Sequence, residues 1–343
     1  MTAWLWGAGL GLVCVTMDDD LRAEIQGVLG PRLGAGVTVS GVRQLSSGAS
    51  RQTWRFAAAP SGQAPRTYVL QREMVAGGAR PAGTPEALGV NAQARLLTAA
   101  REQGVPVPVV VESGEMGGLQ FMITEWLEGE ALPPKMLRDP GLAPGRARLT
   151  NDCAAALAGI HRIPTGDELG LERADRLAVY REWLDVIDEP RPVLEFAYRW
   201  LAANRPTPGA PVVAHGDFRL GNLLVDAGGL RAVLDWELAH IGDRHEDLAW
   251  PTIRAWRFDR HRQPGTFPEP DAWLDAYAAA AGTGVTVDVE AFRWWQVAGT
   301  WVWAVMSAML ARRHLDGWVA SVEHAMIGRR VCESEWDLLE LLA

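Results

Sequence analysis

The stretch VVAHGDFRLGNLLVDAGGLRAVLDWELAHIGDRHEDLAW, residues 212–250, decides the fold. Within it, the runs NLLVD and RAVLD are separated by AGG, a pattern that predicts a β-hairpin. The hairpin turn would bring Asn222, before the first strand, close to Asp235, at the end of the second. Asp217 lies on the loop before the hairpin. The stretch therefore gathers two carboxylates and an amide, whose oxygens suit a magnesium ion.

The spacing of these residues fits phosphoryl transfer. Asn222 follows Asp217 by five residues, and Asp235 follows it by eighteen. The reaction needs a carboxylate that takes the proton of the attacking hydroxyl, and oxygen ligands for Mg²⁺. Protein kinases place these groups in the pattern H-R-D-x-x-x-x-N, with a further Asp at the next loop. The run His215-Gly216-Asp217 begins a similar pattern here.

The runs HGDFRLGNLLVD and VLDWELAHIGDRHEDLAW resemble the aminoglycoside phosphotransferase family, the small-molecule branch of the protein-kinase-like fold. Within it they are most similar to bacterial phosphotransferases related to the kinase-like domains fused to some acyl-CoA dehydrogenases. The resemblance covers roughly residues 37–330. It implies that Asp217 is the catalytic base, that Asn222 and Asp235 bind Mg²⁺, and that Arg219 neutralises charge in the transition state.

The remaining polar residues of the stretch have less direct parts in this interpretation. His215 is expected to hold the catalytic loop by hydrogen bonds. The resemblance assigns Asp243 and Asp247 to fixing a loop, and leaves Glu237 either behind the magnesium ligands or purely structural. We expect His240 and His245 to be surface or network residues.

The rest of the chain predicts an α+β, protein-kinase-like fold with two lobes. The N-lobe is expected to be an antiparallel sheet with one inserted helix, and the C-lobe to be mainly helical. Strands are predicted at 37–46, 51–59, 66–74, 107–112 and 119–126, and helices at 18–29 and 90–104. We expect an N-terminal extension (1–17) that is disordered or read from an upstream start, an N-lobe (18–126) and a C-lobe (127–343).

Two segments of the N-lobe are predicted to bind ATP. The turn SSGAS can cover the phosphates with backbone N–H groups, and its residues are Ser47, Gly48, Ala49 and Ser50. The segment MITEWLEG, residues 122–129, lies where the family hinge would be. Backbone groups near Glu125 and Leu127 would then contact the adenine.

The N-lobe departs from the family pattern at its phosphate-binding cation. Lys135 is the only lysine of the chain, which excludes a Walker A loop. The third strand has Gln71 at the family's cation position, followed by Arg72, and the inserted helix has Gln93 where Glu is usual. Gln71 and Gln93 would form a neutral pair, with Arg72 or Arg51 supplying charge. Strand alternation places Gln71 and Arg72 on opposite faces.

Composition limits the partners. The net charge of −9 argues against nucleic acid. Three widely spaced cysteines favour a reducing compartment, and we expect the cytoplasm. The apolar run at 3–15 is too short for a membrane span and lacks a signal peptide's basic start, so no membrane partner is expected. Monomer and homodimer both remain open.

The acceptor is expected to be a small hydroxylated molecule. The apolar helix FRWWQVAGTWVWAVMSAML is mostly core, but Trp295 or Trp303 could contact a flat acceptor. No acidic residue lies between Glu290 and Asp316, which disfavours a polycationic aminoglycoside. We therefore favour a hydroxyacid or acyl derivative.

Three alternatives stay open from the sequence. One is an aminoglycoside or macrolide antibiotic kinase. The second is a nucleotide-binding pseudokinase regulator, prompted by Gln71 and Gln93. The third is a hydrolase that holds Zn²⁺ or Mn²⁺ with His215, Asp217, Asp235 and His240.

Overall fold

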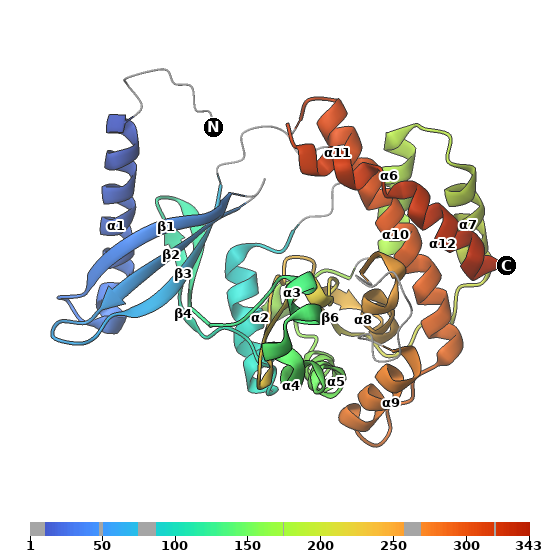
Figure 1. Cartoon of the computed structure of the whole chain (residues 1–343), viewed down its shortest axis with the longest axis horizontal. Helices are drawn as coiled ribbons and strands as arrows, with labels where there is room; N and C mark the ends of the chain where they lie inside the picture. The colour runs from blue at the N-terminus through green and yellow to red at the C-terminus, as the bar shows by residue number, and fades with distance from the viewer. Residues whose placement is uncertain (1–10, 48–50, 75–86, 174, 257–268, 319) are drawn as a thin grey trace. The chain divides into compact units, whose positions relative to one another are not determined.

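The computed structural model describes residues 11–47, 51–74, 87–173, 175–256, 269–318 and 320–343 (Figure 1). It divides into two compact units. Unit 1 contains the described residues within 1–78, 89–94 and 108–126, and unit 2 contains those within 79–88, 95–107 and 127–343. Unit 2 therefore takes two segments that were expected to belong to the N-lobe.

Unit 1 is built on a five-stranded antiparallel sheet with the order β1-β2-β3-β5-β4. The strands are β1 (Thr38–Ser47), β2 (Arg51–Ala59), β3 (Arg66–Glu73), β4 (Val110–Met116) and β5 (Leu119–Glu125). Register pairs Trp54 of β2 with Leu70 of β3, and Thr53 with Gln71. Because side chains alternate along a strand, the first pair and the second pair lie on opposite faces.

Helix α1 (Gly11–Leu33) packs on the face that carries Trp54 and Leu70. Its residues Leu21, Ile25 and Leu29 recur at a spacing of four, which places them on one side of the helix. The helix predicted at 18–29 thus begins earlier, and residues 11–17 of the predicted extension are helical. Residues 1–10 lie outside the described part of the chain.

Unit 2 contains most of the helices and four short strands. Its elements, after helix α2 (Val90–Glu102), which the two units share, are α3 (Pro133–Arg138), η1 (Pro140–Leu142), α4 (Ala143–Arg146), α5 (Leu149–Ile160), η2 (Asp167–Leu169), α6 (Arg176–Ile187), α7 (Pro192–Ala203), β6 (Val212–Ala214), η3 (Leu220–Asn222), β7 (Leu223–Asp226), β8 (Gly229–Val233), β9 (His240–Gly242), α8 (Arg244–Ala249), η4 (Trp250–Thr252), η5 (Arg254–Trp256), α9 (Pro270–Ala281), α10 (Val289–Leu315), α11 (Val322–Gly328) and α12 (Val331–Leu342).

The core of unit 2 forms around α10, which α6, α7, α8, α11 and α12 contact (Figure 1). Most of its positions from Ala291 to Met309 are buried, as expected of a helix that is apolar on all sides. The prediction that this helix belongs mainly to the core is confirmed. Among the described residues, no helix combines the length and the apolar character that crossing a membrane requires.

The predicted hairpin is confirmed as β7 and β8, which pair antiparallel. Strand β6 pairs separately with β9. Val225 of β7 also exchanges two backbone hydrogen bonds with Glu130, at 2.8 and 3.0 Å. The carboxylate of Glu130 in turn lies 3.4 Å from Nζ of Lys135. The hairpin is therefore tied to the segment that leads into α3.

Candidate active site

The predicted catalytic loop, residues 215–222, leaves β6 through Gly216, whose backbone only glycine can adopt without strain. Its φ is 78°, in the left-handed region. A Cβ at this position would also collide with the carbonyl oxygen of Leu238. The glycine therefore turns the chain sharply between a buried strand and Asp217.

Asp247 holds this turn by hydrogen bonds to its backbone. It is fully buried, and its carboxylate accepts hydrogen bonds from the backbone N–H of His215 (2.6 Å) and of Gly216 (2.9 Å). His161 Nε2 lies 3.2 Å from the same carboxylate. Burial acts to raise the pKa of Asp247, but the hydrogen bonds that its carboxylate accepts from His161 and from the backbone of His215 outweigh it and hold the pKa below its usual value. The predicted loop-fixing role of Asp247 is confirmed.

His161 is itself held by Tyr277, whose hydroxyl lies 2.7 Å from Nδ1. Burial raises the pKa of Tyr277 to about 12, so the phenol stays protonated and can donate to Nδ1. His161 then donates from Nε2 to Asp247. A relay from α9 through α5 to α8 thus supports the backbone of the catalytic loop.

His215 links the loop to the end of the hairpin. Its Nδ1 accepts from the N–H of Asp217 (3.2 Å), and its Nε2 donates to the carbonyl of Leu234 (3.1 Å). Only a neutral imidazole can make both bonds, and burial lowers the pKa of His215, which favours that form. The expected role of His215 in holding the loop is confirmed.

Three side chains donate to the carboxylate of Asp217, which is largely buried. Oδ1 accepts from Arg219 Nε (2.9 Å) and from the indole Nε1 of Trp250 (2.6 Å). Oδ2 accepts from Asn222 Nδ2 (2.6 Å). These three bonds fix the carboxylate in one orientation, as a proton acceptor in catalysis requires.

Asn222 and Asp235 lie at the open end of the hairpin, as the sequence predicts. The N–H of Leu234 donates to the carbonyl of Asn222 (2.8 Å), which places the two chain segments side by side. The side-chain Nδ2 of Asn222 is used on Asp217, which leaves Oδ1 as the atom for a metal ion. Asp235 is exposed and has φ of 61°, a left-handed conformation that is unusual for a residue with a side chain.

This donor set fits a magnesium ion. An amide oxygen and an exposed carboxylate are hard ligands, and exposure leaves room for the waters that Mg²⁺ retains. The magnesium roles of Asn222 and Asp235 stay predictions.

The structure does not favour the hydrolase alternative, because both ring nitrogens of His215 are hydrogen-bonded to backbone groups and are not available as metal ligands. His240 likewise bonds Leu238 and Glu246. Across the described residues, no group of three or more His, Cys, Asp or Glu could hold a metal ion.

A second buried network supports the loop from α6. Arg176 donates to the carbonyl of Gly216 (3.4 Å) and forms an ion pair with Glu246 (3.3 Å). Glu246 also meets His240 at 3.1 Å and outweighs burial, so the pKa of His240 is raised. His245 bonds Asp243 at 2.7 Å, and Asp243 also accepts from the N–H of Gly209. His240 and His245 are therefore network residues, and Asp243 fixes its loop as predicted.

Trp250 and Trp256 belong to the site although the sequence did not predict them. Trp250 begins η4 and donates to Asp217, and Trp256 ends η5 with its ring 4.6 Å from the guanidinium carbon of Arg219. Nothing in the local pattern DLAWPTIRAW marks either residue as part of the site. Only their position near the loop, which the packing of α8 and α10 sets, reveals them.

In unit 1, Gln93 accepts a hydrogen bond from Arg51 Nη1 at 3.0 Å. Arg72 points to the opposite face, where it forms an ion pair with Glu24 of α1 (3.0 Å) and lies over Trp54. The geometry thus makes Arg51, and not Arg72, the cation beside Gln93 and on the face of Gln71. The nucleotide roles of Gln71, Arg72 and Gln93 stay predictions.

The other residues predicted to bind the nucleotide are partly described. Gly48, Ala49 and Ser50 lie outside the described residues, and Ser47 is the last residue of β1. The N–H of Glu125 donates to the carbonyl of Val109 (3.0 Å). Leu127 is the first residue of the segment 127–343 of unit 2. Their proposed adenine contacts stay predictions.

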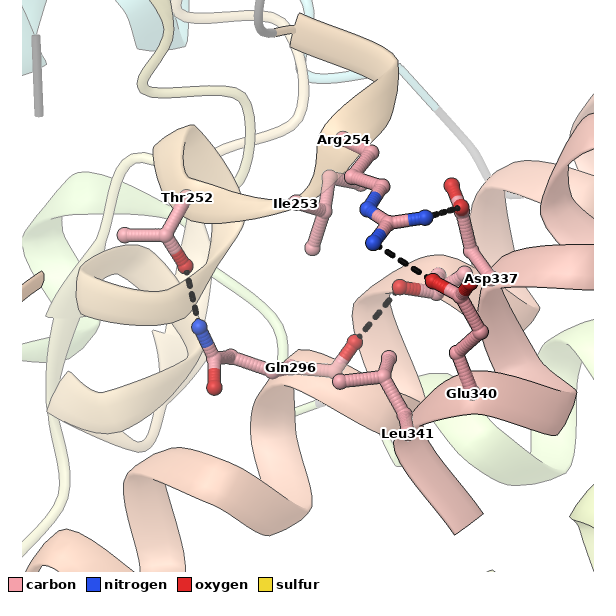
Figure 2. Close-up of a pocket in the computed structure, with 8 residues that line it drawn as sticks. Thr252, Ile253, Arg254, Gln296, Asp337, Glu340 and Leu341 are labelled. Carbon is pink, nitrogen blue, oxygen red and sulfur yellow. Dashed lines mark hydrogen bonds and ion pairs between the residues drawn. The ribbon is translucent and has the colours of Figure 1, made fainter. Parts of the chain in front are cut away.

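A cavity of about 180 Å³ lies between η4, η5, α10 and α12 (Figure 2). Arg254 reaches across it to Asp337 (2.8 Å) and Glu340 of α12, and Gln296 donates to Thr252 (2.9 Å). Carboxylates therefore do lie beside α10. They could not be expected from the sequence of α10 alone, because they come from α12, and both pair with Arg254.

A model of the phosphotransferase enzyme family matches residues 41–295, well over half of the chain. The chain belongs to this family. The match contains the loop with Asp217, the hairpin and the sheet of unit 1 except the first three residues of β1, so the resemblance stated from the sequence is confirmed.

Two relatives show the range of the family. Acyl-CoA dehydrogenase family member 10 of Mus musculus is 27% identical over 227 residues, which cover 60% of this chain and 20% of that protein. An aminoglycoside 3'-phosphotransferase of Escherichia coli is 28% identical over 155 residues, 42% of this chain and 56% of that enzyme. The chain thus spans only a fifth of the first relative and about half of the second.

Solved structures share the fold. A putative aminoglycoside phosphotransferase from Ralstonia eutropha has a TM-score of 0.69 at 20% identity, covering 93% of this chain and 98% of that one. The macrolide 2'-phosphotransferase of Brachybacterium faecium has a TM-score of 0.57 at 18% identity (91% and 97%). A thermostable mutant of an aminoglycoside phosphotransferase, solved in a ternary complex with AMP-PNP and hygromycin B, has a TM-score of 0.53 at 18% identity (91% and 97%). The predicted protein-kinase-like fold is confirmed.

Proposed function

We propose that the protein transfers the γ-phosphoryl group of ATP, with Mg²⁺, to a hydroxyl group of a small molecule. The observation that carries this proposal is the carboxylate of Asp217, fixed by three donors, beside the hairpin end that presents Asn222 and Asp235. Membership of a family of phosphotransferase enzymes supports it. One solved relative was crystallised with the ATP analogue AMP-PNP, which supports ATP as the donor.

The chemistry follows from the roles of these residues. Asp217 accepts the proton of the acceptor hydroxyl while the hydroxyl oxygen of the acceptor forms a bond to the γ-phosphorus. The bond from that phosphorus to the β–γ bridging oxygen breaks, and ADP leaves. A magnesium ion bound by Asn222 and Asp235 would neutralise the phosphate oxygens. Arg219 adds a positive charge within 2.9 Å of the base.

For the acceptor, we propose a hydroxyacid or an acyl derivative. The match to an acyl-CoA dehydrogenase family member supports an acyl derivative as the acceptor, because that relative is named for a family that acts on acyl-CoA. An antibiotic acceptor is the second candidate, because the matches also include an aminoglycoside 3'-phosphotransferase and a macrolide 2'-phosphotransferase. The carboxylates that an aminoglycoside would need beside α10 are paired with Arg254, which favours the first candidate.

The test is Mg²⁺-dependent consumption of ATP with a panel of hydroxyacids, hydroxyacyl thioesters, aminoglycosides and macrolides. We expect one acceptor class to stimulate turnover, and Asp217→Asn to lower kcat by about 10²- to 10⁴-fold, the usual contribution of a positioned base. Asp271→Asn, an exposed change in the first turn of α9, is the matched control. ATP binding without turnover on any acceptor would refute the proposal and favour the pseudokinase alternative.

A further inference from the structure

A stripe of polar side chains runs along the otherwise apolar helix α10. Gln296, Thr300, Trp303 and Ser307 follow one another at spacings of four, three and four residues. This spacing places all four on one side of an α-helix. A polar stripe on a buried helix needs partners on the facing element, because an unpaired polar group away from water costs free energy.

The facing element is the segment 250–256 that carries Trp250 and Trp256. Gln296 donates to Thr252 (2.9 Å), and the rings of Trp303 and Trp256 meet at 4.4 Å between centroids. Between these contacts, α10 has Gly299, where a Cβ would lie 3.3 Å from the ring of Trp250. The stripe thus faces the two residues that contact Asp217 and Arg219.

The two ends of the stripe differ in how their donors are satisfied. At the Gln296 end the polar groups bond one another around the cavity of Figure 2. At the other end, the indole N–H groups of Trp256 and Trp303 and the hydroxyl of Ser307 have no hydrogen-bond partner within the described part of the chain. These residues are 6%, 7% and 0% exposed, so water does not solvate them freely.

This lack of partners is selective. Five other buried tryptophans of unit 2 donate from their indole N–H to an oxygen of the protein; they are Trp236, Trp250, Trp273, Trp294 and Trp301. A buried donor left unpaired costs about 1–3 kcal/mol. The two unpaired indoles touch each other, and one of them carries Arg219 on its face. Buried polar atoms of Arg, Asn and His residues elsewhere in the described part of the chain also lack partners, but among the buried tryptophans of unit 2 the unpaired donors are these two, which lie in contact beside Arg219.

Two guanidinium groups lie near these donors. Arg219 lies 4.6 Å from the ring centre of Trp256, and Arg330 lies 5.9 Å from that of Trp303 and donates to the carbonyl of Ala255. Arg219 is paired with Asp217 (2.9 Å) and Arg330 with Glu333 (3.2 Å), so their charges are balanced by carboxylates and the two indole N–H donors carry the selection. An N–H donor bonds an oxygen that accepts hydrogen bonds, whereas an ammonium group, which has donors only, gains no bond there.

We propose that Trp256 and Trp303 are specificity-determining residues that bind a carbonyl, carboxylate or ether oxygen of the acceptor molecule. This inference rests on the proposed function. It selects acceptors that carry such an oxygen in addition to the hydroxyl and selects against amines.

The experiment measures acceptor binding by calorimetry without nucleotide, and phosphorylation separately with Mg²⁺ and ATP. The probes are hydroxy acids of increasing chain length, their methyl esters, amino alcohols of the same lengths, and hygromycin B. We expect acids or esters to bind, and Trp303→Phe and Trp256→Phe each to weaken that binding about tenfold, the value of one lost hydrogen bond of about 1.4 kcal/mol. For Trp303→Phe, the loss should appear in the acceptor KM more than in kcat.

The matched control is Trp301→Phe, which removes an indole N–H that donates to Leu194 instead. Best binding by the amino alcohols or hygromycin B would overturn the inference, and so would a failure of every probe to bind. Unchanged binding in both tryptophan variants, as expected if a buried water serves their N–H groups, would also overturn it. Tryptophan-dependent binding without phosphorylation would overturn the proposed function alone, and phosphorylation that ignores both tryptophans would overturn this inference alone.

Discussion

The replacement Trp250→Phe tests whether the indole N–H orients the catalytic carboxylate. In the structure this N–H donates to Oδ1 of Asp217 at 2.6 Å, and Trp250 is 4% exposed. Phenylalanine keeps an aromatic ring but removes the donor. A hydrogen bond to a charged group contributes about 1.5–3 kcal/mol, and two of the three donors to Asp217 remain. We therefore expect kcat to fall about 10- to 100-fold, since each 1.4 kcal/mol or so is a factor of ten.

The assay is steady-state ATP consumption with the best acceptor, together with the ATP KM and the thermal midpoint. The ATP KM should stay within about twofold, because Trp250 belongs to unit 2 and bonds the base, and the loss should fall on kcat. Trp301→Phe loses the same volume and an equivalent N–H bond, to Leu194, from a fully buried site. Both variants should lose stability, about 1–3 kcal/mol, through incomplete filling of the core. Equal kcat values for the two variants, at a temperature where both are folded, would refute the orienting role.

Two further predictions concern the loop support and the nucleotide cation. Asp247→Asn should lower the thermal midpoint at neutral pH. The lowered pKa of Asp247 means that its carboxylate stabilises the fold above its unfolded pKa near 3.8. The difference in thermal midpoint between the variant and the wild type should therefore shrink as the pH falls below about 4, and a difference independent of pH in a series of melting curves would contradict this prediction. Arg51→Gln should raise the ATP KM about tenfold, since Arg51 is the cation beside Gln93. Arg72→Gln, which breaks contacts with Glu24 and Trp54 on the opposite face, should leave the ATP KM unchanged. The reverse order of effects would favour Arg72 as the phosphate ligand.

The sequence predicted those parts of the site that depend on local order. The hairpin and the closeness of Asn222 to Asp235 follow from two apolar runs and a short turn. One short segment of the sequence is therefore enough to predict both. The alternation of side chains along β3 likewise separates Gln71 from Arg72, and the ion pair of Arg72 with Glu24 agrees with that separation.

The parts that the sequence could not supply depend on packing between distant elements. Trp250 reaches Asp217 across 33 residues, and its position depends on how α8 leaves the loop and meets α10. The carboxylates of Asp337 and Glu340 reach the side of α10 only because α12 packs there. The choice of Arg51 over Arg72 depends on the contact of β2 with α2. Apolar periodicity says which face of a helix is buried, but not which neighbour covers it.

Because Lys135 is the only lysine of the chain, amine-reactive reagents have a single side-chain target apart from the terminal amine. Its side chain is 63% exposed and its nearest charge is Glu130. A dye coupled there would sit on α3, and Glu130 just before this helix hydrogen-bonds to Val225 of β7, the strand that follows Asn222. Labelling would thus reach one side chain without mutagenesis, and the signal of the dye on Lys135 would follow the hairpin when metal or nucleotide is added.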